Sequence, residues 1–170
     1  MLGLMAGVGL AFMIEMLNDL LRTPSDVMRH LHIPLLGMIC HSEEDEAIEN
    51  IDLYHVVREA PYSIVSECYR QFRANLQLSS TGVSQKAILI TSCNAGCGKT
   101  SVASNMAVTL IAEDRKVLFI DANFRRPSTP SLFPQVHKDD SIPGHPDFGL
   151  SNYLMAQCEY NDLKRSSGID

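Results

Sequence analysis

This sequence of 170 residues lacks three features: paired cysteine motifs, an excess of positive charge and a hydrophobic run long enough to span a membrane. Its five cysteines are odd in number and never spaced as C-x-x-C, which argues against a disulfide framework and a zinc site and fits a reducing cytoplasm. The formal net charge of −6 argues against a general nucleic-acid binder. The 45% apolar content is enough to bury a single core.

The N-terminal stretch Met1–Ile14 is uncharged and mostly apolar, but it is shorter than the roughly 20 residues that a membrane helix needs. It also lacks the basic region and cleavage site of a signal peptide. It is either a buried helix or the last part of a transmembrane helix, and its small residues favour the second. Arg22 and Arg29 suit a cytoplasmic exit. We predict that residues 1–21 are the C-terminal part of a transmembrane helix in the inner membrane, with the chain after about residue 21 in the cytoplasm.

Residues 22–60 are predicted to form a juxtamembrane helix and an acidic linker. Thr23 is a candidate N-cap, Pro24 suits the first helical position and Asp26 the first turn, so a short helix to about Leu31 is expected. Residues 42–50, SEEDEAIEN, are acidic without apolar periodicity and are predicted to be a mobile linker.

The segment 61–80 has the spacing of an amphipathic helix. Its predicted apolar face consists of Ile64, Val65, Cys68, Phe72 and Leu76. Glu67, Arg70 and Arg73 line the opposite face, which is predicted to remain free. On pattern alone, an ordinary surface helix with an intrahelical Glu-Arg pair is the simpler interpretation, and a contact surface is the alternative.

The stretch 92–101, SCNAGCGKTS, follows the apolar run 87–91, which is predicted to be a buried strand. The glycines let the chain fold tightly around an anion, so that loop and first-turn N–H groups reach phosphate oxygens. Lys99 would reach the β- and γ-phosphates of ATP, and the Thr100 hydroxyl would bind Mg²⁺. The predicted nucleotide-binding residues are Asn94, Ala95, Gly96, Cys97, Gly98, Lys99, Thr100 and Ser101.

A glycine-containing turn with a surface lysine is the alternative for this loop. The helical spacing of the apolar residues that follow it favours phosphate binding. Cys93 stands where the usual Walker A pattern has Gly or Ala, and the loop is similar to the deviant Walker A group. Members of that group that partition plasmids or place the division site carry a signature lysine where this chain has Asn94, so that branch is disfavoured.

A second buried strand is predicted at 116–121. Strand, helix and parallel strand form a right-handed βαβ unit, whose ligands lie at the carboxyl ends of the strands. Asp121 is therefore expected near Lys99 and Thr100, where it could hold Mg²⁺ or accept a proton; a helix cap is the alternative. The expected fold is α/β, a P-loop NTPase with a mostly parallel sheet. With two long strands the sheet is undersized.

Beyond this unit, residues 128–147 are predicted to form a long surface loop near the nucleotide. Ser151 is a plausible N-cap for a helix running to about Glu159.

The chain resembles the bacterial tyrosine autokinases (BY-kinases) of capsular and exopolysaccharide biosynthesis, in the form fused to a chain-length-determinant membrane segment. Five stretches in the expected order carry the resemblance over nearly all 170 residues. They are the apolar N-terminus with EMLNDLLRTPSDVMRHLHIPLLGMI, then SECYRQFRANL, the phosphate loop, VLFIDANFRRP and GLSNYL.

The resemblance implies roles for particular residues. Glu67, Arg70 and Arg73 match a helix that joins family members into a ring. Asp121 and Arg125 match the second acidic motif, D-x-D-x-R, in which Asn123 replaces the second acid and leaves Mg²⁺ with one fewer negative ligand. Lys99 and Asp121 are the implied catalytic residues, and Thr100 and Asp121 the implied metal ligands.

The implied function is that of a membrane-tethered, ATP-dependent protein-tyrosine kinase that regulates exopolysaccharide chain length and export. The implied partners are further copies of the chain, the polysaccharide assembly machinery and the membrane, without nucleic acid. A further acidic strand (Walker B) and a tyrosine-rich tail are expected in the family but not found here. Residues 61–170 therefore resemble only the N-terminal part of a kinase domain, whose activity would depend on that strand. The alternatives are a non-kinase switch ATPase of the same fold and a nucleotide-binding scaffold without turnover.

Overall fold

The computed structural model describes residues 2–16, 24–79, 85–128, 132–133, 148–165 and 167. By its internal contacts the chain divides into a first unit, Met1–Leu36, and a second unit, Gly37–Asp170.

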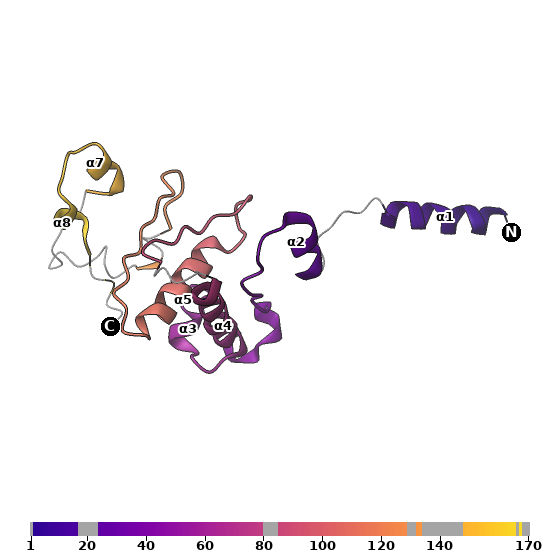
Figure 1. Cartoon of the computed structure of the whole chain (residues 1–170), viewed down its shortest axis with the longest axis horizontal. Coiled ribbons are helices and arrows are strands. Elements are labelled where there is room, and N and C mark those ends of the chain that lie inside the picture. Colours follow the sequence, from indigo (N-terminus) through magenta and orange to yellow (C-terminus); the bar gives the residue numbers. More distant parts are fainter. Residues whose placement is uncertain are drawn as a thin grey trace. The chain divides into compact units, whose positions relative to one another are not determined.

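The first unit consists of two helices, α1 (Leu2–Met16) and α2 (Pro24–Leu31) (Figure 1). Apolar side chains of α1 are exposed, including Met5 at 77% and Phe12 at 78%. Within the described residues, no helix combines the length and the apolar character needed to cross a membrane. The prediction for α2 is confirmed, because the helix begins at Pro24 and carries Asp26 in its first turn. Thr23, the expected N-cap, lies outside the described residues.

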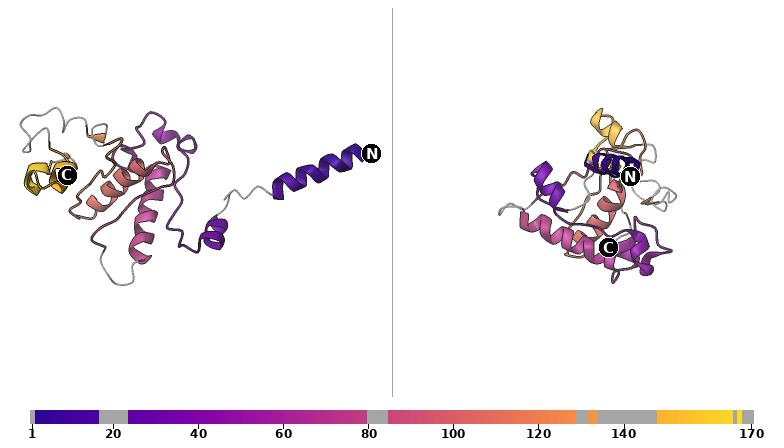
Figure 2. Two further views of the ribbon diagram at one scale, coloured as in Figure 1. Left: turned by 90° about the horizontal axis from the view of Figure 1, so that it is seen from above. Right: turned by 90° about the vertical axis from the view of Figure 1, so that its right-hand side faces the viewer.

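The second unit is built on three helices that pack together, α3, α4 and α5 (Figures 1 and 2). Buried side chains of α3, α4 and the preceding turn η2 form one apolar cluster, against which Val102 and Val108 of α5 pack. The cluster consists of Ile48, Val56, Val57, Val65 and Tyr69. Burying such side chains contributes roughly 1.5–3 kcal/mol each. In chain order, the described helices of this unit are η1 (Ser42–Glu44), η2 (Glu46–Ile48), α3 (Val56–Glu59), α4 (Ile64–Ser79), α5 (Lys99–Ile111), α7 (Leu150–Leu154) and α8 (Tyr160–Leu163).

The acidic run 42–50 is ordered, and the prediction of a mobile linker here is wrong. It forms the two 3₁₀ turns η1 and η2, and Ile48 is only 2% exposed in the core. The Asp45 carboxylate explains the order, because Oδ1 accepts from the Ala47 N–H at 3.2 Å and Oδ2 from the Val65 N–H at 3.1 Å. One acid therefore caps η2 and holds the first turn of α4, which apolar periodicity cannot reveal.

A buried amide joins α5 to α3. The side chain of Asn105, on α5, is fully buried, and its Oδ1 accepts from the Val57 N–H at 2.9 Å. Its Nδ2 donates to the carbonyls of Leu53 at 2.7 Å and Ser101 at 2.8 Å. Buried polar groups are stable only when they are paired, and three bonds satisfy this amide. Asn105 thus fixes α5, and the loop that precedes it, against the α3 region.

The buried face of α4 includes most of the predicted one, since Val65 is buried and Cys68, Phe72 and Leu76 are half-buried. Ile64 is 58% exposed, whereas Ser66 and Tyr69 are buried at 0% and 4%. The Ser66 hydroxyl donates to the Ala60 carbonyl at 2.7 Å, so a polar side chain is accommodated in the packed face. The contact face is therefore rotated about the helix axis toward Tyr69, and Arg73, four residues further on, lies at its edge rather than on a free surface.

The two predicted strands are absent from the described part of the chain, which contains no β-strand. Leu89, at the centre of run 87–91, is 86% exposed, and Ile120, near the end of run 116–121, is 59% exposed. A parallel sheet requires helices on both faces and hydrogen-bonded neighbours, and two strands alone are marginal. The prediction of a sheet is therefore wrong for these residues, although they do flank α5 in the expected order.

The helix predicted to run to about Glu159 is shorter than expected. α7 begins at Leu150, and its N-cap is Gly149 and not Ser151, because the Asn152 Oδ1 accepts from the Gly149 N–H at 3.0 Å. It ends at Leu154, and Ala156 then adopts a left-handed φ of 56° that cannot continue the helix. Most of the loop predicted at 128–147 lies outside the described residues.

Candidate functional site

The glycine loop has the backbone geometry that phosphate binding requires. Gly96 and Gly98 have φ values of 79° and 73°, a left-handed conformation that side chains with a Cβ rarely adopt. A Cβ at either position would meet no atom within 4 Å, so glycine is needed for the backbone and not for space. Gly98 is the N-cap of α5 and makes no side-chain cap bond. The first N–H groups of α5 therefore face the loop without a capping side chain.

The ammonium of Lys99 is folded over this loop. Its Nζ donates to Ser92 Oγ at 2.8 Å and to the Asn94 carbonyl at 2.9 Å. The Ser92 hydroxyl in turn donates to the same Asn94 carbonyl at 2.8 Å. These oxygens hold the cation over the loop, and phosphate oxygens are stronger acceptors that could replace them.

Asp121 is joined to the start of α5 through one hydroxyl group. Its Oδ2 accepts from both the N–H and the Oγ of Ser128, at 2.6 and 3.0 Å. The Ser128 Oγ lies 3.3 Å from Thr100 Oγ1. The structure therefore brings Asp121 and Thr100, the two predicted metal ligands, to the same place although the predicted strand is not formed.

The turn after Asp121 is stabilised by its own side chains. Asp121 Oδ1 accepts from the Asn123 N–H at 2.9 Å, and Asn123 Oδ1 accepts from the Arg126 N–H at 3.2 Å. Asp121 thus stabilises a local turn as well as facing Ser128, and Asn123 acts as a turn residue. Arg125 is exposed.

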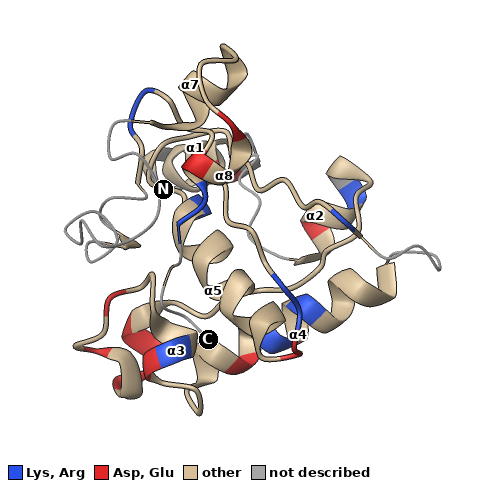
Figure 3. Ribbon diagram, turned by 90° about the vertical axis from the view of Figure 1, so that its left-hand side faces the viewer, with Lys and Arg blue, Asp and Glu red and all other residues tan. Residues whose placement is uncertain are grey.

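The charged residues of α4 divide into two groups (Figure 3). Arg70 Nε donates to Glu67 Oε2 at 2.8 Å, and Arg70 Nη2 donates to the Pro61 carbonyl at 2.7 Å; both side chains are partly exposed. Arg73 instead reaches α5, where Nη1 donates to the Thr109 carbonyl at 2.7 Å and Nη2 lies 3.1 Å from Glu113 Oε1. Glu67 and Arg70 remain on the surface, whereas Arg73 stabilises the helix pair.

The comparisons with known proteins match the part of the chain that carries this site. Residues 83–147, which contain the loop and Asp121, match the ParA family described as NUBPL iron-transfer P-loop NTPase. The tyrosine-protein kinase YwqD of Bacillus subtilis is 40% identical over 73 residues, which are 43% of this chain and 31% of YwqD. Further relatives named as tyrosine-protein kinases match at 24% to 31% identity. This chain is a relative of the bacterial tyrosine-protein kinases.

Two further matches extend over more of the chain. The succinoglycan biosynthesis transport protein ExoP of Rhizobium meliloti is 27% identical over 149 residues, covering 74% of this chain and 19% of ExoP. The crystal structure of the chimerical protein CapA2B2 superposes with a TM-score of 0.61 and 29% identity, covering 82% of this chain and 53% of that one. The likeness supports a P-loop NTPase fold. The chain spans less than half the length of the first curated relatives it matches.

The sequence alone did not predict two hydroxyl groups of the candidate site. Ser92 holds Lys99, and Ser128 connects Asp121 to Thr100. Ser92 could have been found, because a hydroxyl directly after an apolar run and within a glycine loop lies close to the lysine. Ser128 had no such signal, since it follows Asp121 by seven residues in a polar stretch.

The candidate site offers few protein ligands for a metal ion. Among the described residues, no group of three or more His, Cys, Asp or Glu side chains is placed to hold a metal ion. Thr100 and Asp121 supply oxygen donors of the kind that Mg²⁺ prefers, and Mg²⁺ is usually held by one or two such groups together with substrate phosphates. The donor set therefore fits a magnesium ion that binds with the nucleotide.

Proposed function

We propose that this chain contains the ATP-binding site of a protein-tyrosine kinase. The observation that carries the proposal is the convergence at the start of α5. The left-handed glycine loop, the Lys99 ammonium and the Thr100–Ser128–Asp121 hydrogen bonds all lie there. The named kinase relatives support this reading of the site.

Each residue of the proposed site has a role in transfer of the γ-phosphoryl group. Lys99 and the N–H groups of residues 94–101 would bind the phosphates and neutralise their charge, which supplies most of the catalysis in this reaction class. Thr100 and Asp121 would hold Mg²⁺, which supplies further charge neutralisation. Asp121 would also be placed to accept the proton of an attacking tyrosine hydroxyl.

The cellular setting is a further part of the proposal. The uncovered apolar side chains of α1 support a membrane tether at residues 1–21, with the rest of the chain on the cytoplasmic side. The ExoP match supports a role in exopolysaccharide chain length or export with polysaccharide assembly partners. Glu67 and Arg70 are the surface residues proposed to contact a second copy in a ring, and Arg73 would contribute by positioning α4.

Phosphotyrosine formation tests the proposed activity. A longer protein that carries residues 1–170 together with the expected acidic strand and tyrosine-rich tail is incubated with γ-labelled ATP and Mg²⁺, and labelled tyrosine is measured after acid hydrolysis. Lys99→Met should abolish the label, whereas Lys164→Met, which removes an exposed lysine outside the loop, should retain it. ATP hydrolysis without phosphotyrosine in the unmodified chain would instead support a switch ATPase, and nucleotide binding without either reaction would support a scaffold.

A further inference from the structure

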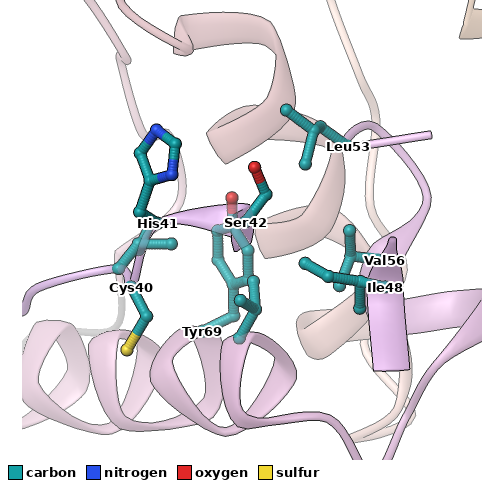
Figure 4. Close-up of a pocket in the computed structure, with 9 residues that line it drawn as sticks. Cys40, His41, Ser42, Ile48, Leu53, Val56 and Tyr69 are labelled. Carbon is teal, nitrogen blue, oxygen red and sulfur yellow. The ribbon is translucent and has the colours of Figure 1, made fainter. Parts of the chain in front are cut away.

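Two cysteines from distant parts of the second unit face each other. Cys40 lies in the irregular segment before η1, and Cys68 lies on α4, 28 residues further on; their Sγ atoms are 3.4 Å apart. Both are free thiols and half-buried. In Figure 4 the Cys40 sulfur points toward the helix that carries Tyr69, which is α4.

The segment that carries Cys40 runs closely along α4. A Cβ at Gly37 would lie 3.3 Å from the Cβ of Phe72, which is tighter than ordinary contact. Cys68 and Phe72 are one helical turn apart, so Gly37 and Cys40 contact successive turns of the same helix. The close packing of Gly37 on Phe72 therefore holds the segment that carries Cys40 beside the turn that carries Cys68.

The thiols are within reach of a covalent bond. A disulfide needs an Sγ–Sγ distance of about 2.05 Å, so the two sulfur atoms would have to approach by about 1.3 Å. Cys40 also lines a cavity of about 280 Å³ together with His41, Ser42 and Tyr69 (Figure 4). This space allows the segment to shift without displacing core side chains.

We propose that Cys40 and Cys68 form a reversible intramolecular disulfide in the presence of a low-molecular-weight disulfide such as oxidised glutathione. One cysteine thiolate attacks a glutathione sulfur, forming a mixed disulfide and releasing one glutathione thiolate. The second cysteine, after losing its proton to solvent, attacks the protein sulfur and displaces the other glutathione. Two electrons pass from the protein thiols to the reagent, and the products are one protein disulfide and two glutathione thiols.

In a reducing compartment the pair remains as two thiols. The hydrogen bond with Cys68, and then burial, raise the pKa of Cys40 above its ordinary value, so that this group stays protonated near neutral pH. A smaller thiolate fraction slows attack on a disulfide, so the reaction with oxidised glutathione should be faster at mildly alkaline pH. This inference does not depend on the proposed kinase activity.

The disulfide would have a measurable effect on the fold. It would close a loop that contains η1, η2 and α3 and join the segment at Gly37 to α4. Constraining the unfolded chain in this way should raise the thermal midpoint by about 5 °C or more.

Peptide mapping of the whole chain tests the proposal. The reduced protein is incubated with oxidised glutathione at mildly alkaline pH, the remaining thiols are alkylated, and a digest is analysed by mass spectrometry without reduction. We expect a Cys40–Cys68 linked peptide that disappears after reduction. Cys40→Ser and Cys68→Ser should each lose it, whereas Cys158→Ser, which removes another half-buried thiol, should retain it.

Two results would overturn the proposal. One is recovery of Cys40 and Cys68 as unlinked thiols or separate glutathione adducts while the exposed Cys93 and Cys97 react. The other is an equal yield of the Cys40–Cys68 link in concentrated urea, since the folded geometry would then not be its cause. Both measurements use the unmodified protein, so they stand even if a serine variant fails to fold.

Discussion

At the scale of single residues, Asp121 has two kinds of contact that can be separated by mutation. Its Oδ1 stabilises a local turn, and its Oδ2 faces Ser128 and, through it, Thr100. If Asp121 holds Mg²⁺, the Asp121→Asn variant should bind Mg²⁺ more weakly. The Mg²⁺ concentration that it needs for nucleotide binding should rise by about tenfold or more. Titrating Mg²⁺ at fixed nucleotide concentration measures this.

Asn123→Ala is the matched control for Asp121→Asn. It removes the bond to the Arg126 N–H from the same turn but no carboxylate, so the Mg²⁺ dependence should stay the same. If both variants needed more Mg²⁺ to the same degree, the intact turn and not the charge of Asp121 would explain the effect.

Tyr69 gives the folded chain a predictable response to alkaline pH. Burial raises the pKa of this phenol above its ordinary value of 10.0, and the interaction with Asn105 lowers it to a smaller extent. The folded state then binds the phenolic proton more tightly than the unfolded chain. The resulting stability is fully present below pH 10 and is lost as the pH rises from 10 through the raised pKa.

Tyr69→Phe should therefore reduce the alkaline loss of stability. Above pH 10 the unfolding free energy of the unmodified chain should fall more steeply than that of the variant, by up to about 1.4 kcal/mol per pH unit. Urea unfolding at several pH values measures how the unfolding free energy of each protein changes with pH. Tyr62→Phe is the control, because Tyr62 is exposed. Parallel slopes in all three proteins would contradict the burial of this hydroxyl.

At the scale of elements, Arg70 and Arg73 lie three residues apart on α4 and should behave differently. Arg73 bonds to the Thr109 carbonyl and Glu113 at the end of α5, and its side chain is 17% exposed, so Arg73→Ala should lower the unfolding free energy by about 2 kcal/mol. Arg70 is 36% exposed and pairs with Glu67 on the surface, so Arg70→Ala should change it by less than about 1 kcal/mol.

Light scattering of the same two variants tests the proposed ring. Arg70→Ala should reduce the size of any oligomer while leaving the unfolding curve nearly unchanged. The opposite result is that only Arg73→Ala alters the oligomer, without loss of stability. Arg73, and not the Glu67–Arg70 pair, would then be the surface contact of α4.

The elements themselves show what local sequence could and could not reveal. The starts of α2 and α5 were predictable, because Pro24 and the Gly98-Lys99 junction act within one turn. The turns η1 and η2 were not predictable, because they are held in place by the bond from the Val65 N–H to Asp45, twenty residues away in the sequence. The buried face of α4 was predicted from hydrophobicity alone. That pattern missed Ser66 and Arg73, which join the packed side through hydrogen bonds.

At the scale of the whole molecule, the site was predicted better than the architecture around it. Thr100 and Asp121 are joined through Ser128, whereas the Lys99 ammonium bonds to Ser92 within the loop, and all of these contacts lie at the start of α5. The parallel sheet expected from runs 87–91 and 116–121 is absent from the described residues, and the core consists of α3, α4, α5 and η2. Strands depend on distant partners that a two-strand pattern does not supply.

The central claim is that the loop around Gly96 and Gly98, with Lys99, binds a nucleoside triphosphate. Isothermal titration calorimetry with Mg-ATP tests it most directly, with unmodified chain, Lys99→Met and Lys164→Met compared under the same conditions. We expect saturable heat with one site per chain, the same affinity for Lys164→Met, and affinity at least about tenfold weaker for Lys99→Met. No heat from the folded, unmodified chain, or equal affinity in Lys99→Met, would contradict the account.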